Sequence, residues 1–329
     1  MSRVAILGAG SWGTTLAVHL ASGGHQVQLW GRNAAELAQV DRERENRKFL
    51  PGIKLPERVK VRSELDAALS KADFIVFVVP SQATGEVAAR VRSEGARGLP
   101  VLASKGLELG TLRRLSEVVA DALGATDPVV LTGPSHAEEV SREVPSSVVA
   151  AAHDEARARA VQELFSTDRL RVYTNDDVAG CEYGAALKNV IAIAAGVCDG
   201  LGFGDNTKGA LLTRGLAEIS RVGMEMGGRR ETFFGLTGLG DLIATAMSRH
   251  SRNRHVGECV GRGQSLEATL SGMVMVAEGV HTTRAAHDLA RKRSLELPIV
   301  EQVHGMLFEG RRPAEALRAL MTRDLKRES

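Results

Sequence analysis

The fold is decided by residues 4–33, VAILGAGSWGTTLAVHLASGGHQVQLWGRN. The apolar run from Val4 to Leu7 is followed directly by glycines and a helix-forming stretch, and a second apolar run, Val27 to Trp30, comes next. A strand, a glycine turn, a helix and a second strand form the opening unit of a doubly wound parallel sheet. The sequence therefore predicts a Rossmann-type fold.

The turn carries Gly8, Gly10 and Gly13 in GxGxxG register. In such a turn the first glycine permits the tight bend, the second lets the backbone approach a pyrophosphate, and the third allows close packing of helix on strand. The helix N-terminus then offers free N–H groups to the phosphates. The alternative is a glycine-rich turn without a ligand, but the strand–turn–helix–strand context favours dinucleotide binding.

The second strand is followed by Arg32 and Asn33, at the place where an NAD-specific site often has Asp or Glu. A guanidinium there suits the additional phosphate of NADP. We therefore expect NADP(H) to be preferred, with NAD(H) possible. The alternative is that Arg32 is a surface arginine that points to water.

The first half of the chain alternates short aliphatic runs with segments of helical periodicity, as βαβ units do. We expect strands at 4–7, 27–30, 59–61, 74–79, 101–103, 129–131, 147–151 and 171–173. We expect helices between them at 36–47, 84–94, 111–123 and 153–165.

The second half shows no strand pattern after Asp177. Its helical patterns lie at 178–199, 207–226, 238–248, 277–292, 298–309 and 313–322. The predicted fold class is thus α/β, with a mostly parallel sheet followed by an all-α domain. We expect a dinucleotide-binding domain over 1–178 and a substrate-binding and catalytic domain over 179–329.

Composition limits the possible functions and locations. The 329 residues are 43% hydrophobic and 25% charged, with a net charge of only +2, which argues against a nucleic-acid-binding protein. Cys181, Cys198 and Cys259 lie far apart without the spacing of a disulfide framework or a zinc site. We therefore expect no metal site. No export signal is recognisable and the apolar runs are too short to span a bilayer, so we expect a cytoplasmic protein.

One charge, Lys188, stands inside the apolar stretch YGAALKNVIAIAAGV at 183–197. The residues one helical turn away from Lys188 are uncharged and mostly small, which leaves room for a ligand: Gly184, Ala185, Ile191 and Ala192. The alternative is a lysine whose head group reaches water along its own stem. A buried lysine would instead have a lowered pKa and could transfer protons.

Polar residues also follow the predicted strands, at the edge where a doubly wound sheet binds its ligands. Lys105 in LASKGLELG can reach an anion there, and GPSHAEE places Gly133, Ser135 and His136 after the next strand. His136 is titratable, but a lone histidine is more often structural. In the second half, Asp241 and the run Ser251, Arg252 and Asn253 offer donors suited to a phosphate monoester, or else form a capped surface turn.

Several motifs occur in one order along the chain: GAGSWGT, FLPGIKLP, KGLE, GPSHAEE, ALKN, DNTKGALLTRGLAE, GLGDL, SRN and AEGV. Together they resemble the NAD(P)-dependent glycerol-3-phosphate dehydrogenases of the bacterial biosynthetic type. The resemblance extends from residue 4 to beyond residue 279. It implies interconversion of dihydroxyacetone phosphate and sn-glycerol 3-phosphate, a supply of glycerol 3-phosphate for phospholipid synthesis, and a homodimer.

The resemblance also implies a role for individual residues. Lys188 matches the proton donor and acceptor. Cofactor contacts are implied for Gly8, Gly10, Ser11, Trp12, Gly13, Arg32, Lys105, Ala137, Arg252, Val276 and Glu278. Substrate contacts are implied for Lys105, Gly133, Ser135, Lys188, Asp241, Ser251, Arg252 and Asn253. The family often has a basic or amide residue where this chain has Val276 or Glu278, and Asp241 could either position the lysine or hold a substrate hydroxyl.

Two other functions share part of this pattern. A β-hydroxyacid or sugar-acid dehydrogenase would need a carboxylate-binding group in place of the phosphate donors at 251–253. A non-catalytic NADP(H) sensor would need only the first domain and would have no reason to keep both Lys188 and Asp241.

Overall fold

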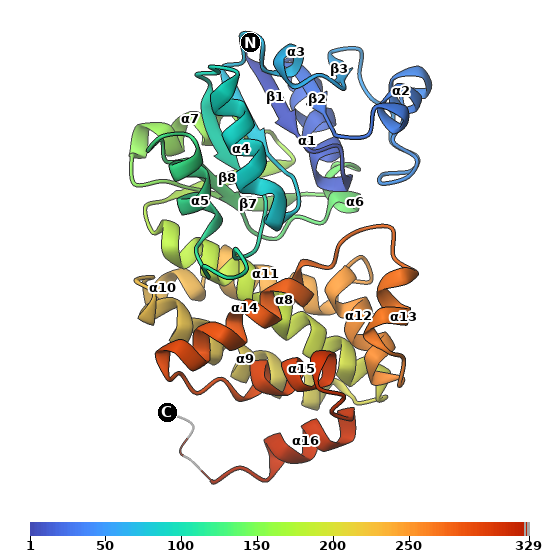
Figure 1. Cartoon of the computed structure of the whole chain (residues 1–329), viewed down its shortest axis with the longest axis vertical. Helices are drawn as coiled ribbons and strands as arrows, with labels where there is room; N and C mark the ends of the chain where they lie inside the picture. The colour runs from blue at the N-terminus through green and yellow to red at the C-terminus, as the bar shows by residue number, and fades with distance from the viewer. Residues whose placement is uncertain (326, 328–329) are drawn as a thin grey trace.

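The computed structural model describes residues 1–325 and 327, and it consists of a sheet with flanking helices stacked on a helical half (Figure 1). Positions 326, 328 and 329 of the predicted second domain lie outside the described residues. One sheet has the order β3-β2-β1-β4-β5-β6-β7-β8. Its strands are β1 (Arg3–Leu7), β2 (Gln26–Trp30), β3 (Val59–Arg62), β4 (Phe74–Phe77), β5 (Leu99–Leu102), β6 (Val129–Thr132), β7 (Ser146–Ala151) and β8 (Leu170–Asn175). All eight predicted strands are confirmed.

The sheet is mostly parallel, because only β7 runs antiparallel to its neighbour β6 within the described pairings. Both of its faces are covered. The helices of this half are α1 (Ser11–Ser22), α2 (Ala34–Glu43), α3 (Leu65–Leu69), α4 (Thr84–Ser93), α5 (Leu115–Ala122), α6 (Ala137–Val140) and α7 (Glu155–Phe165), with a 3₁₀ turn, η1, at Ser81–Ala83.

Alternate residues of β1 face opposite sides of the sheet. Val4 and Ile6 belong to one apolar cluster with α1 and α7, whereas Ala5 and Leu7 belong to another with α3, α4 and α5.

Two predicted helix bounds in this half were wrong, each because of a left-handed residue. Helix α2 stops at Glu43 rather than 47, since Arg44 has a φ of 51° and donates to the carbonyls of Pro56 and Val59. Helix α5 begins at Leu115 rather than 111, since Leu112 has a φ of 64°. Helix α3 was missed because five residues are too few to show a helical period.

The second half is helical, and no strand follows β8 within the described residues. Its elements are α8 (Val178–Gly200), α9 (Asp205–Glu225), α10 (Arg230–Phe233), the π-helical turn η2 (Leu236–Gly240), α11 (Asp241–Met247), α12 (Arg252–Gly261), α13 (Leu266–Ser271), α14 (Glu278–Arg293), α15 (Pro298–Phe308) and α16 (Pro313–Met321). The fold class predicted from the sequence is confirmed.

Helix α12 was not predicted, and its packing on α8 explains why it forms. A Cβ atom on Gly257 would lie 1.9 Å from the carbonyl oxygen of Ile193, and one on Gly196 would lie 1.9 Å from that of Arg254. The two backbones therefore touch, which stabilises a helix whose own sequence, RNRHVGECVG, is polar and contains two glycines. Helices α10 and α13, of four and six residues, were also missed.

Helix α8 is the centre of the helical half. Among the described residues it alone is long and apolar enough to cross a membrane, with a mean hydropathy of 1.2 over its most apolar 18 residues, and that stretch is entirely buried by the other elements. Its apolar character is therefore used in the core.

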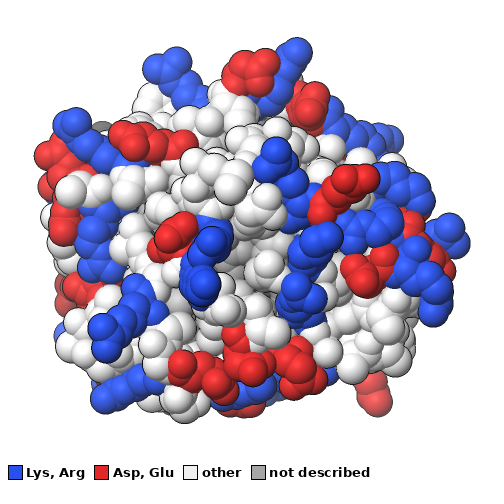
Figure 2. Space-filling model, turned by 90° about the horizontal axis from the view of Figure 1, so that it is seen from above, with Lys and Arg blue, Asp and Glu red and all other residues white. Residues whose placement is uncertain are grey.

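Basic and acidic side chains are interspersed on the face seen from above in Figure 2, with no broad area of one sign. This distribution agrees with the small net charge of the chain.

Candidate active site

The glycine turn between β1 and α1 has the geometry that a dinucleotide requires. Gly8 has a φ of 128°, and a Cβ atom there would lie 2.6 Å from the carbonyl oxygen of Val78. A Cβ on Gly13 would lie 1.8 Å from the Gly8 oxygen, whereas one on Gly10 would meet no atom within 4 Å. Gly10 also precedes α1 without a capping side chain. The space over Gly10 and the first N–H groups of α1 therefore fit a pyrophosphate.

This turn opens on a cleft of about 460 Å³ between the sheet and the helical half. With one exception, the predicted site residues line the cleft: Gly8, Gly10, Ser11, Trp12, Gly13, Arg32, Lys105, Ser135, Ala137, Lys188, Asp241, Ser251, Arg252, Asn253, Val276 and Glu278. The exception is Gly133, whose carbonyl oxygen accepts hydrogen bonds from Lys105 Nζ at 2.9 Å and Ser135 Oγ at 3.0 Å. Gly133 thus lies behind the cleft wall and orients two residues that face it.

One end of the cleft is formed around the end of β2. Arg32 is exposed and lines the cleft, and the neighbouring Asn33 caps α2 by accepting from Glu36 N at 3.2 Å. The buried Asn46 amide donates to the Ala9 carbonyl at 2.9 Å and to Thr14 Oγ1 at 2.8 Å, which ties the 44–50 loop to the glycine turn. Arg32 therefore places a guanidinium at the edge of the cleft, directly after β2.

Two lysines share one carboxylate at the centre of the cleft. Asp241, the first residue of α11, accepts a hydrogen bond from Lys105 Nζ through Oδ2 at 2.7 Å, and its Oδ1 lies 3.1 Å from Lys188 Nζ. Lys188 also donates to Thr245 Oγ1 at 2.6 Å, and that hydroxyl donates to Asp241 Oδ1 at 3.2 Å. Lys188 is only 5% exposed, so its ammonium is held in one place by polar groups rather than by water.

Burial controls the protonation of this cluster. Desolvation lowers the pKa of Lys188 to about 8, although the Asp241 carboxylate opposes the change. Burial would raise the pKa of Asp241, but the two lysines hold it below its ordinary value. Burial also lowers the pKa of His136, whose Nε2 lies 3.3 Å from the Ala244 carbonyl. Near neutral pH, Lys188 can therefore both lose and regain a proton while Asp241 stays charged.

The Ser251, Arg252 and Asn253 side chains do not form the free set of donors that the sequence suggested. Ser251 caps α12 by accepting from Arg254 N at 3.1 Å, and Arg252 donates to the Val276 carbonyl at 2.9 Å. Asn253 donates to Asn189 at 2.8 Å and accepts from Gly279 N at 2.9 Å. The run forms the N-terminus of a helix at the cleft, and such an end attracts anions through its N–H groups and dipole.

Glu278 links the two halves beside this helix. Its carboxylate accepts from the backbone N of Ser81 at 3.0 Å and from Ser81 Oγ at 2.5 Å. No local sequence pattern marks this pair, because the two residues are 197 positions apart. Thr245 was also missed, although its place four residues after Asp241 puts it on the same helix face and could have been noticed.

A glycine turn at the carboxyl end of β1, together with a buried lysine–carboxylate cluster contributed by a helical second half, defines a two-domain nicotinamide-dinucleotide dehydrogenase. Residues 3–158 match the family model described as NAD-dependent glycerol-3-phosphate dehydrogenase N-terminus, and residues 177–318 match the model for the C-terminus of the same family. The chain belongs to the NAD-dependent glycerol-3-phosphate dehydrogenase family.

Individual relatives agree along the whole chain. An NAD(P)+ glycerol-3-phosphate dehydrogenase of Chlorobium limicola is 49% identical over 330 residues, which cover 99% of both chains. One of Pelotomaculum thermopropionicum is 50% identical over 332 residues, covering 98% of this chain and 93% of the relative. The crystal structure of the Coxiella burnetii glycerol-3-phosphate dehydrogenase superposes with a TM-score of 0.95 at 39% identity, covering 98% and 99% of the two chains.

Proposed function

We propose that this chain interconverts dihydroxyacetone phosphate and sn-glycerol 3-phosphate, with NADP(H) or NAD(H) as the redox partner. The observation that carries the proposal is the Lys105–Asp241–Lys188 cluster, buried in the same cleft as the glycine turn. Membership of the family supports the activity, and the names of the relatives support the use of both cofactors.

In the proposed mechanism Lys188 moves the proton. A reduced dinucleotide bound at the glycine turn would supply the hydride to the carbonyl carbon. The Lys188 ammonium polarises the carbonyl oxygen and then donates its proton to the developing alkoxide, and in the reverse direction the neutral amine accepts the proton from the hydroxyl. Thr245 and Asp241 hold Nζ in position during both steps, because each lies within hydrogen-bonding distance of it. We therefore propose that Asp241 is a positioning residue, which is one of the two roles left open by the sequence.

Lys105 and the start of α12 complete the proposed substrate site. Lys105 adds a second positive charge to the cleft, which offsets the negative charge of a phosphorylated substrate. Ser251, Arg252 and Asn253, at the start of α12, line the cleft, and the free N–H groups of this helix end would receive the phosphate. A lysine and a helix N-terminus would also bind a carboxylate, so it is the family match that disfavours a hydroxyacid dehydrogenase.

The proposed function also includes a cofactor preference, a role for each half of the chain and a cellular location. We propose that Arg32 makes NADP(H) the preferred cofactor, that residues 1–178 bind it, and that residues 179–329 bind substrate. We propose a cytoplasmic homodimer, without nucleic-acid partners, that supplies glycerol 3-phosphate for phospholipid synthesis. The free thiols of Cys181, Cys198 and Cys259 fit a reducing compartment.

One assay tests the activity directly. Loss of NADPH absorbance is followed after addition of dihydroxyacetone phosphate, and the measurement is repeated with NADH. Ketoacids are then tested as substrates for reduction, and β-hydroxyacids as substrates for oxidation with the oxidised cofactor. We expect turnover with the triose phosphate and with both cofactors. Turnover of hydroxyacids without turnover of the triose phosphate would refute the proposed substrate.

A further inference from the structure

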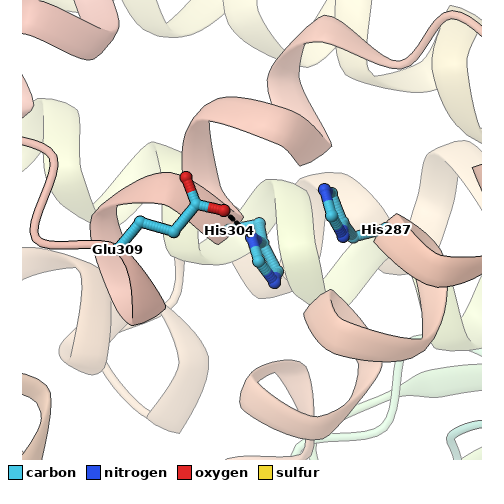
Figure 3. Close-up of side chains that lie close together, drawn as sticks. All are labelled: His287, His304 and Glu309. Carbon is cyan, nitrogen blue, oxygen red and sulfur yellow. Dashed lines mark hydrogen bonds and ion pairs between the residues drawn. The ribbon is translucent and has the colours of Figure 1, made fainter. Parts of the chain in front are cut away.

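A second cluster of chemically reactive side chains lies in the helical half, away from the cleft. It consists of His287 on α14, His304 on α15, and Glu309, which directly follows α15 (Figure 3). One ligand atom from each side chain lies within 4.8 Å of the other two. The proposed reaction uses none of these residues, and none of them lines the cleft.

The cluster leaves one polar atom unsatisfied. His287 Nδ1 is buried and has no hydrogen-bond partner among the described residues, and the nearest carboxylate oxygen, on Asp288, is 3.7 Å away. A buried polar atom without a partner destabilises the folded state. A bound group that accepts the lone pair of this nitrogen would remove that cost.

The two imidazoles face each other closely. Their rings are stacked with centroids 3.8 Å apart and an angle of 9° between the planes (Figure 3). His304 Nδ1 lies 3.1 Å from Glu309 Oε1, while Glu309 Oε2 lies 3.4 Å from Arg311. The two rings and the carboxylate therefore lie together at one place between α14 and α15.

We propose that His287, His304 and Glu309 form a binding site for a borderline divalent transition metal, of which zinc is the representative ion. Two imidazole nitrogens and one carboxylate oxygen are a ligand set that such metals prefer over magnesium or calcium. Metal–ligand bonds of about 2.0–2.2 Å require ligand atoms roughly 3.4 Å apart in a tetrahedral site. The stacked rings must therefore rotate about their Cβ–Cγ bonds so that their lone pairs converge, which partly exposed side chains on adjacent helices permit.

The proposed site has a structural role. A metal held by His287 and His304 cross-links α14 to α15, and Arg311 keeps its contact with the other oxygen of Glu309. His287 lies nine positions after Glu278, which corresponds to about 13 Å along α14, so the metal is remote from the reacting atoms. Binding stabilises the folded chain, because the unfolded chain does not bring the three ligands together.

The test uses the full chain without a polyhistidine tag, titrated with zinc chloride in a buffer that does not bind metals. We expect one zinc per chain by calorimetry, a melting temperature that rises with zinc concentration, and unchanged turnover in the assay above. His304→Gln and Glu309→Gln should each weaken zinc binding at least tenfold. Glu309 is half exposed, so its variant reports on the site even if His304→Gln folds poorly.

Control variants identify the ligands. His281→Gln removes a histidine from the same helix outside the cluster and should bind zinc as the wild type does. Cys259 and His255 lie 3.7 Å apart on α12 and form the competing pair, so Cys259→Ser should also leave binding unchanged. Cobalt(II) should give visible ligand-field bands without a thiolate charge-transfer band. Zinc binding abolished by Cys259→Ser, or unaffected by both His304→Gln and Glu309→Gln, would overturn the proposal.

Discussion

Lys188 Nζ lies 3.1 Å from Oδ1 of Asp241, and both side chains are buried between the sheet and the helical half. A buried ammonium without a counter-charge would cost several kcal/mol, so the pairing explains how a lysine persists in the long, apolar and buried helix α8. The carboxylate offsets only part of the desolvation, which leaves the pKa of Lys188 at about 8. A lysine in this state suits reversible proton transfer near neutral pH.

Replacement of Lys188 by alanine should remove the proton donor. We expect kcat for triose phosphate reduction to fall by roughly 10²–10⁴-fold, the usual contribution of a positioned acid or base, with a smaller change in the cofactor KM. Steady-state kinetics provide the measurement, and Lys208→Ala, which removes a lysine outside the cleft, is the control. A Lys188→Ala turnover within tenfold of wild type would show that another group donates the proton.

The pH dependence of kcat should report the pKa of Lys188, with opposite trends for reduction and for oxidation. Reduction needs the ammonium, so its kcat should fall as pH rises through about 8, whereas oxidation needs the free amine, so its kcat should rise over that range. Asp241→Asn removes the charge that favours the ammonium, and both profiles should then move to lower pH. If the pH profiles of this variant do not move, the pKa measured in the kinetics belongs to a group other than Lys188.

Cofactor preference should depend on Arg32. In Arg32→Asp we expect the KM for NADPH to rise by about 10–100-fold, because a charge-assisted contact to the ribose phosphate is replaced by repulsion, while the KM for NADH changes little. Arg58→Asp, at an exposed arginine outside the cleft, is the matched control. An unchanged ratio of the two Michaelis constants would mean that Arg32 points to water in the complex.

Two glycines of the turn should respond differently to the same substitution. Gly10 has a φ of −80° and open space around its Cβ position, so the Gly10→Ala protein should keep its stability. The added methyl group should obstruct the pyrophosphate and raise the cofactor KM. Gly13→Ala collides with the Gly8 carbonyl and should lower the free energy of unfolding by about 1–3 kcal/mol or more. Urea unfolding and cofactor titration distinguish the two effects, and equal loss of stability in both variants would contradict this assignment.

Glu218 should make stability depend on pH. Its buried carboxylate accepts from the backbone N of Ile299 at 2.8 Å and of Val300 at 3.2 Å, and burial raises its pKa to about 7. The folded protein therefore binds this proton more tightly than the unfolded chain, so the free energy of unfolding should fall by up to about 3 kcal/mol as pH rises from about 4.5 to about 7. Urea unfolding at several pH values should show a weaker dependence in Glu218→Gln than in wild type. Parallel curves for the two proteins would exclude Glu218 as the source.

Local sequence was sufficient for the strands and for the glycine turn. The strands of the sheet are short apolar runs bounded by glycines and polar residues, and buried parallel strands carry that signal within a few residues. The GxGxxG spacing likewise reflects local backbone geometry. Gly8 has a φ of 128°, and a Cβ atom on Gly13 would lie 1.8 Å from the Gly8 carbonyl oxygen, so both positions need glycine. Helix α12 was missed because its stability comes from α8, which is more than fifty residues away in sequence.

By itself the sequence determined the fold class, the position of the dinucleotide turn and the isolation of Lys188, because each of these follows from the pattern of neighbouring residues. Only the tertiary structure decided how the charges pair. It placed Asp241 between Lys105 and Lys188, occupied the Asn253 side chain with Asn189, and joined Glu278 to Ser81 across the cleft. Hydrogen bonds and ion pairs depend on distances of about 3 Å between atoms that are far apart in the chain, and such distances are set by packing.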